Sequence, residues 1–81
     1  MAEVPASVRT LAQERFSGED LELVLATLAE YGDESWHREQ ERVLRDVLLL
    51  ADGNADEVAR LVAYAKTDYR DVLYWAEYQG R

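Results

Sequence analysis

One histidine and two glutamates near the middle of the chain have the clearest potential for chemistry. Glu34 and His37 have the Glu-x-x-His spacing of carboxylate metal sites in helical bundles, and Glu41 follows one helical turn later. On a continuous helix the three side chains would share one face. A two-metal site also needs a second such motif, and the chain has one histidine and no cysteine, so only a homodimer could complete it. Metal binding by Glu34, His37 and Glu41 is therefore an alternative to a simpler role, in which His37 borders the core and pairs with Glu41.

Other catalytic arrangements each lack a component. Ser35 and His37 are two residues apart, so they would not face each other on a helix as a serine–histidine dyad must. The four glycines are isolated and form no phosphate-binding loop, and the absence of cysteine excludes a thiolate metal site and a cysteine nucleophile. We therefore expect a protein without catalytic activity and without a cofactor.

Several large apolar side chains remain after the buried positions are assigned. Tyr74 and Tyr78 lie one helical turn apart near the end of the chain, Leu49 lies among arginines, and Leu23 lies near Glu30. Tyrosine is enriched where partners dock, so these residues indicate a protein–protein interaction patch of Tyr74, Tyr78, Leu49 and Leu23. The alternative is a last helix that is central and buried nearly all round. The partner is a protein of unknown identity, with a second copy of the chain as one option.

The rest of the sequence predicts the helices that carry these residues. Apolar side chains recur at helical spacing, and no segment alternates long enough for a strand. The fold class is all-α, a compact bundle of four to five short helices with orthogonal packing. Residues 1–81 form a single helical domain, in which residues 1–17 are a peripheral or loosely attached first helix. The expected helices are 5–16, 19–31, 35–52, 55–66 and 68–79.

Residues with special backbone preferences mark the expected helix ends. Gly32, Gly53 and Gly80 each follow an apolar run, where a left-handed residue closes a helix. Asn54 stands before the fourth helix, and Glu57 follows at the spacing of a capping box.

The charge limits the kinds of partner. Seventeen acidic side chains against nine basic ones give a formal net charge of −8 over 81 residues. A surface of this sign repels phosphate backbones and anionic lipids, so we expect neither nucleic acid nor a membrane as a partner. Residues 18–32 carry four acids and no base. An acidic mimic of nucleic acid, bound to a basic partner, is a further alternative.

The apolar runs are short. The longest, at residues 47–51, is far below the roughly 20 residues that cross a bilayer. The first residues have neither the basic nor the apolar region of a secretory signal. We therefore expect a soluble, cytoplasmic protein.

The C-terminal segment has a distinctive sequence. Residues 68–78 read DYRDVLYWAEY, with His37-Arg38-Glu39 and Glu41-Arg42-Val43 upstream. This pattern resembles small, uncharacterised bacterial all-helical proteins that share such a C-terminal helix, and the resemblance covers about residues 21–78. It implies a compact helical bacterial protein and carries across no activity, cofactor or site residue.

Overall fold

The computed structural model describes residues 3–34 and 37–79, and within them the chain forms five helices and no strand. The prediction of an all-α bundle of short helices is confirmed. The helices are α1 (Ala6–Arg15), α2 (Gly18–Leu28), α3 (Gln40–Ala51), α4 (Ala55–Thr67) and α5 (Tyr69–Gln79).

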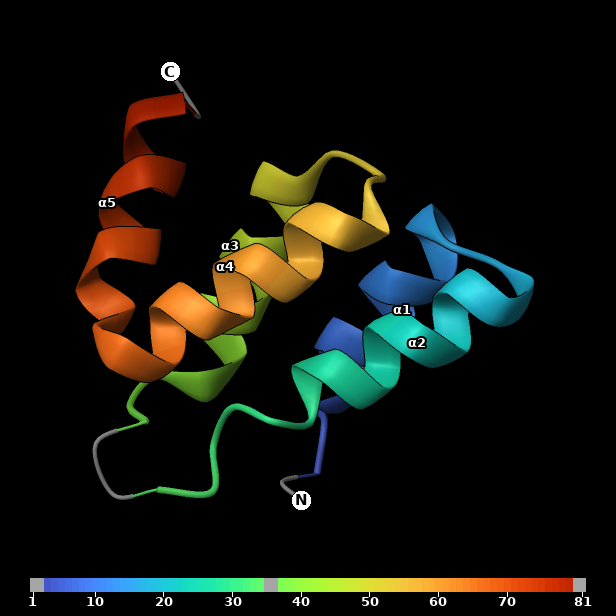
Figure 1. Ribbon diagram of the computed structural model, residues 1–81, viewed down its shortest axis with the longest axis horizontal. Coiled ribbons are helices and arrows are strands. Elements are labelled where there is room, and N and C mark those ends of the chain that lie inside the picture. The colour runs from blue at the N-terminus through green and yellow to red at the C-terminus, as the bar shows by residue number, and fades with distance from the viewer. Residues whose placement is uncertain (1–2, 35–36, 80–81) are drawn as a thin grey trace.

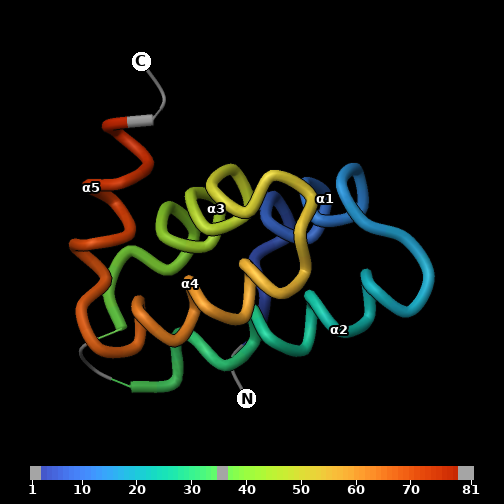
Figure 2. Tube along the Cα trace, turned by 45° about the horizontal axis from the view of Figure 1, so that its top comes forward, coloured from blue at the N-terminus to red at the C-terminus, as the bar shows by residue number. Residues whose placement is uncertain are grey.

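The helices α3 and α4 occupy the middle of the molecule. Figures 1 and 2 show α1 and α2 on one side of this central pair and α5 on the other. The central helices pack against each other and both contact α5, while α1 packs on α3 and α2 packs on α4. A Cα radius of gyration of 11.3 Å fits one compact domain of this length. The arrangement leaves the outer side of α5 without a covering helix.

The core is made almost wholly of aliphatic side chains. The longest row lies on α3, where five residues at helical spacing are buried, and α4 contributes four more. No charged or polar side chain is buried among the described residues. The α3 and α4 core residues are Val43, Leu44, Val47, Leu48, Ala51, Val58, Leu61, Val62 and Ala65.

The first helix belongs to this core. Val8 and Ala12 on α1 are fully buried, and Val4 and Phe16 are buried at its two ends. Four buried side chains therefore attach this first helix to the core, where α1 packs on α3.

The third helix starts later than its sequence predicts. It begins at Gln40 rather than at residue 35, and α2 ends at Leu28 rather than at residue 31. In the intervening segment the backbone N–H groups of Gly32 and Glu34 donate to Nδ1 of His37, at 2.9 and 3.4 Å. A side chain that binds nearby backbone donors competes with helix formation, which explains the late start. Ser35 and Trp36, which we expected on this helix, lie outside the described residues.

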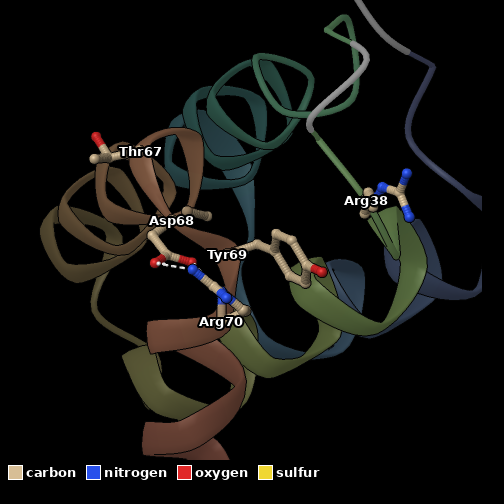
Figure 3. A pocket seen from close by; sticks show the side chains of 6 residues that line it. Arg38, Thr67, Asp68, Tyr69 and Arg70 are labelled. Atoms are coloured by element: carbon tan, nitrogen blue, oxygen red, sulfur yellow. Dashed lines mark hydrogen bonds and ion pairs between the residues drawn. The ribbon is translucent and has the colours of Figure 1, made fainter.

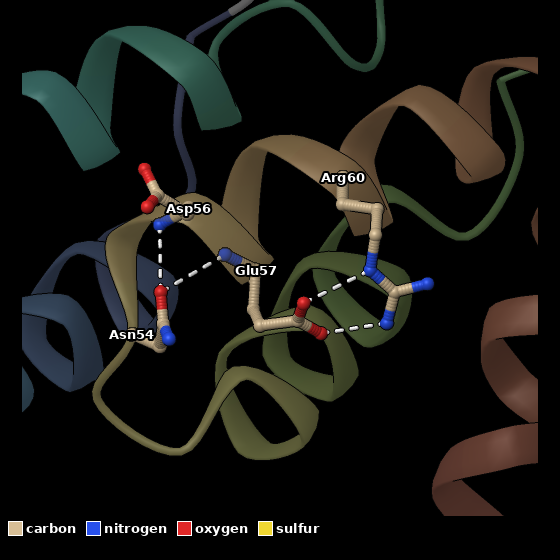
Figure 4. Close-up of polar contacts among 4 residues, drawn as sticks. All are labelled: Asn54, Asp56, Glu57 and Arg60. Carbon is tan, nitrogen blue, oxygen red and sulfur yellow. Dashed lines mark hydrogen bonds and ion pairs between the residues drawn. The ribbon is translucent and has the colours of Figure 1, made fainter.

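The cap predictions hold in part. The side-chain oxygen of Asn54 accepts hydrogen bonds from the N–H groups of Asp56 and Glu57, so Asn54 is the N-cap of α4 (Figure 4). The Glu57 carboxylate binds Arg60 instead of closing a capping box. At the end of α3 the left-handed conformation falls on Asp52, at φ 49°, as well as on Gly53.

The fourth and fifth helices are joined by one residue. Asp68 is extended, and it lies between Thr67 at the end of α4 and Tyr69 at the start of α5. The two helices therefore meet at a sharp corner (Figure 1). In the described part of the chain, no helix is both long enough and apolar enough to cross a membrane.

Candidate interaction surface

The structure does not assemble the predicted metal ligands. Glu34 and His37 precede α3 and Glu41 lies within its first turn, so the three residues do not share a helix face. Glu41 accepts a hydrogen bond from the Ser7 hydroxyl at 2.9 Å. In residues 3–34 and 37–79, no three histidine or acidic side chains come close enough together to hold a metal ion. The Glu-x-x-His interpretation required a helix that this segment does not form.

His37 instead holds the segment between α2 and α3 in place. In addition to the two backbone hydrogen bonds at Nδ1, its ring stacks on Tyr31, with centroids 4.6 Å apart and planes 18° apart. The Tyr31 hydroxyl donates to the carbonyl oxygen of Arg38 at 2.7 Å. Burial, with smaller contributions from Tyr69 and Glu39, raises the pKa of Tyr31 to about 12. These contacts give His37 a structural role.

The tyrosine pair, defined as Tyr74 and Tyr78, lies on the outer side of α5. The two side chains are 58% and 70% exposed, and their ring centroids are 5.3 Å apart. One helical turn separates the residues, which brings the rings together on one face. The alternative of a last helix buried nearly all round is wrong, because Val72 is the only fully buried side chain among residues 69–78.

The two leucines of the predicted patch do not join the tyrosine pair. Leu23 is 57% exposed on α2 and Leu49 is 50% exposed on α3. Helices α2 and α5 lie on opposite sides of the central helices (Figures 1 and 2), so Leu23 is remote from the tyrosine pair. Leu49 lies on α3, a helix that packs against α5. The four-residue patch is therefore divided among three helices.

A hollow lies at the junction of α4 and α5. Its volume is about 440 Å³, and we call it the α4–α5 hollow. Asp71 of α5 precedes Tyr74 by three residues, which places it on the same side of the helix as the tyrosine pair. The lining residues are Arg60, Ala63, Tyr64, Thr67 and Asp71.

Aromatic and ionic contacts fix the walls of this hollow. Tyr64, which is 45% exposed, packs against Trp75 edge to face with centroids 5.2 Å apart, and the Arg60 guanidinium lies 5.6 Å from the Tyr64 ring centroid. Both oxygens of Glu57 accept hydrogen bonds from Arg60, at 2.6 and 3.0 Å (Figure 4). This hydrogen-bonded pair lowers the pKa of Glu57 and raises that of Arg60. Two of the side chains that line the hollow, Arg60 and Tyr64, thus have contacts within the chain.

A second hollow, of about 360 Å³, lies at the corner between α4 and α5. Figure 3 shows Arg70 turned towards Asp68, with Arg38 on the far side of Tyr69. The Arg70 side chain donates to both oxygens of Asp68, and these bonds lower the pKa of the Asp68 carboxyl group. Arg70 is therefore already paired with a carboxylate of the same chain.

The sequence analysis missed Tyr64, Arg60 and Asp71. Tyr64 lies off the buried row of α4, so the search for surplus apolar residues that found Tyr74 would also have found it. The proximity of Asp71 to Tyr64 carries no sequence signal, because it depends on how α5 crosses the end of α4.

Comparison with known protein families, with curated proteins and with solved structures finds no match to this chain.

Proposed function

We propose that this protein is a small, non-catalytic, cytoplasmic module that binds another protein through the outer side of α5. The observation that carries the proposal is the exposure of the adjacent Tyr74 and Tyr78 side chains. Tyrosine offers a large contact area with few rotatable bonds, and truncation of such residues at interfaces commonly costs more than about 1 kcal/mol of binding free energy.

The setting of the tyrosine pair supports the same function. Asp71, which lines the α4–α5 hollow, lies on the same side of α5 as the two rings, and Tyr64 in the wall of the hollow packs against Trp75. At many docking sites, one side chain of the partner enters a hollow while exposed aromatic rings around the hollow contact the rest of the partner. The α4–α5 hollow and the tyrosine pair would allow such binding.

A capture experiment with three baits tests this proposal. The immobilised protein is compared with a Tyr74→Ser/Tyr78→Ser variant and with a Leu23→Ser/Leu49→Ser control, in extract of the source organism. The control removes two apolar side chains from other helices that are also half or more exposed. We expect specific partners to be lost from the tyrosine variant and retained by the leucine control, with unchanged circular dichroism for all three baits. Capture of the same proteins by all three baits would contradict the proposal.

A further inference from the structure

One carboxylate, that of Asp71, lines the α4–α5 hollow. The Asp71 carboxylate is exposed and makes no hydrogen bond or ion pair with any residue that the structure describes. The Arg60 guanidinium, which also lines the hollow, is bound by both oxygens of Glu57. Arg70, whose pKa is raised in small part by Asp71, is held by Asp68. Both nearby cations are thus bound by other carboxylates, and Asp71 supplies the one carboxylate among the residues that line the hollow.

The remaining walls suit a flat cationic side chain. Ala63, Thr67 and the ring of Tyr64 are mainly apolar, and the Tyr74 and Tyr78 rings stand exposed on the same side of α5 as Asp71. A guanidinium group can stack on tyrosine while it donates two hydrogen bonds to a carboxylate, whereas an ammonium group acts only as a point charge. The volume of about 440 Å³ lies within the range of small-ligand sites, about 300–1,000 Å³. A carboxylate beside tyrosine rings therefore favours arginine over lysine.

The net charge of the protein disfavours binding of any negatively charged partner to this surface. Two copies at −8 each would repel one another, as would nucleic acid or an anionic lipid surface. A basic protein segment would instead be attracted from a distance and then held by the Asp71 carboxylate.

We propose, building on the function above, that the partner of this module presents an arginine-bearing basic segment, whose guanidinium enters the α4–α5 hollow against Asp71 while neighbouring side chains cover Tyr74 and Tyr78.

Fluorescence anisotropy with a synthetic probe tests this inference. The probe is a fluorescein-labelled dodecapeptide with three arginines spaced by glycine, serine and leucine, and its matched control carries citrulline, an uncharged isostere, in place of each arginine. At 0.15 M NaCl we expect the arginine peptide to bind about tenfold more tightly than the citrulline peptide. Asp71→Asn should remove this preference, and Tyr74→Ser should weaken binding about fivefold or more.

The Asp20→Asn variant provides the matched control for charge. It makes the same change in net charge on α2, across the molecule from α5, and should leave the affinity within about twofold of that of the unaltered protein. Equal losses from Asp20→Asn and Asp71→Asn would reduce the binding to general electrostatic attraction and overturn the inference. Equal affinity for the two peptides would also overturn the inference. So would the absence of binding of either peptide at a protein concentration of about 1 mM.

Two further outcomes separate this inference from the proposed function. A partner whose capture requires Tyr74 and Tyr78 but is unaffected by Asp71→Asn would overturn the arginine site and leave the proposed function standing. Sedimentation of the protein as a dimer that Tyr74→Ser dissociates would assign the surface to a second copy of the chain and overturn the basic partner.

Discussion

At the scale of single residues, Tyr31 and His37 determine how the chain passes from α2 to α3. The imidazole accepts from two backbone N–H groups, and the phenol stacks on it and donates to the carbonyl oxygen of Arg38. Gln40, the first residue of α3, donates to the carbonyl oxygens of Glu3 and Tyr31. Polar groups in this segment are thus satisfied by side chains where helical hydrogen bonds are absent.

The buried phenol of Tyr31 makes stability depend on alkaline pH. The pKa of Tyr31 is raised from 10.0 to about 12, so the unfolded chain loses the phenol proton at a lower pH than the folded protein does. The contribution of this phenol to the stability of the fold is therefore complete below pH 10 and is lost as the pH rises towards 12. The loss over this window should be about 2 kcal/mol. We expect Tyr31→Phe to lower the free energy of unfolding by about 1 kcal/mol at pH 7. The variant should also lose less stability than the unaltered protein above pH 10.

Urea unfolding at pH 7, 9, 10 and 11 measures this difference. The curves of stability against pH for the two proteins should converge as the pH rises. Parallel curves would show that the phenol of Tyr31 does not control alkaline stability.

At the scale of elements, α4 depends on its N-cap. The Asn54 side chain satisfies the N–H groups of Asp56 and Glu57, which have no partner within the first helical turn. Asn54→Ala should therefore lower the free energy of unfolding by about 1 kcal/mol. Asn54→Asp, which keeps the acceptor, is the control and should stay within about 0.5 kcal/mol of the unaltered protein. Thermal unfolding of the three proteins measures these differences. Equal losses in the free energy of unfolding for the two variants would contradict the prediction.

The last helix should be the least protected element. Val72 is its one fully buried residue, whereas α3 has five buried residues. Local opening exposes amides most easily where few apolar contacts hold an element. We expect backbone amides of residues 73–78 to exchange with deuterium faster than those of residues 44–50, as measured by NMR. Equal protection of the two segments would show that α5 opens only when the whole domain unfolds.

The sequence predicts the helices well where local signals agree. Cap residues and apolar spacing identify α4 and α5 to within one residue at each end. They fail at the start of α3, because the acceptor that breaks the helical pattern is a histidine side chain whose donors lie up to five residues away.

The candidate site was predictable only in part. Tyr74 and Tyr78 follow from helical spacing, since both fall off the buried side of α5. Asp71 and Tyr64 line the same hollow, and Leu23 lies far from the tyrosine pair, because of the way in which the helices pack on one another. Helical spacing within one segment contains no information on that packing.

At the scale of the whole molecule, we expect acidic self-repulsion to outweigh the ion pairs. The net charge is −8, and the ion pairs recorded among the described residues lie between side chains that are roughly one-third or more exposed. Exposed pairs contribute little to stability, typically about 0–1 kcal/mol each, whereas repulsion acts across the whole surface.

This balance predicts that salt stabilises the fold. Raising NaCl from 0.01 to about 0.3 M shortens the Debye length from about 30 Å to below 8 Å. We expect the Tm measured by circular dichroism at pH 7 to rise by a few degrees over this range. A falling Tm would show that the ion pairs dominate instead.

The edge-to-face contact between Tyr64 and Trp75 has an optical consequence. The chain has two tryptophans, so Trp36→Phe leaves Trp75 as the single indole emitter. At a centroid separation of 5.2 Å, light absorbed by Tyr64 passes efficiently to the indole. When α5 leaves α4, the contribution of Tyr64 to the transfer falls, while the tyrosines of α5 itself stay near Trp75. Trp75 emission excited through Tyr64 therefore reports on the contact between α4 and α5 without an added dye.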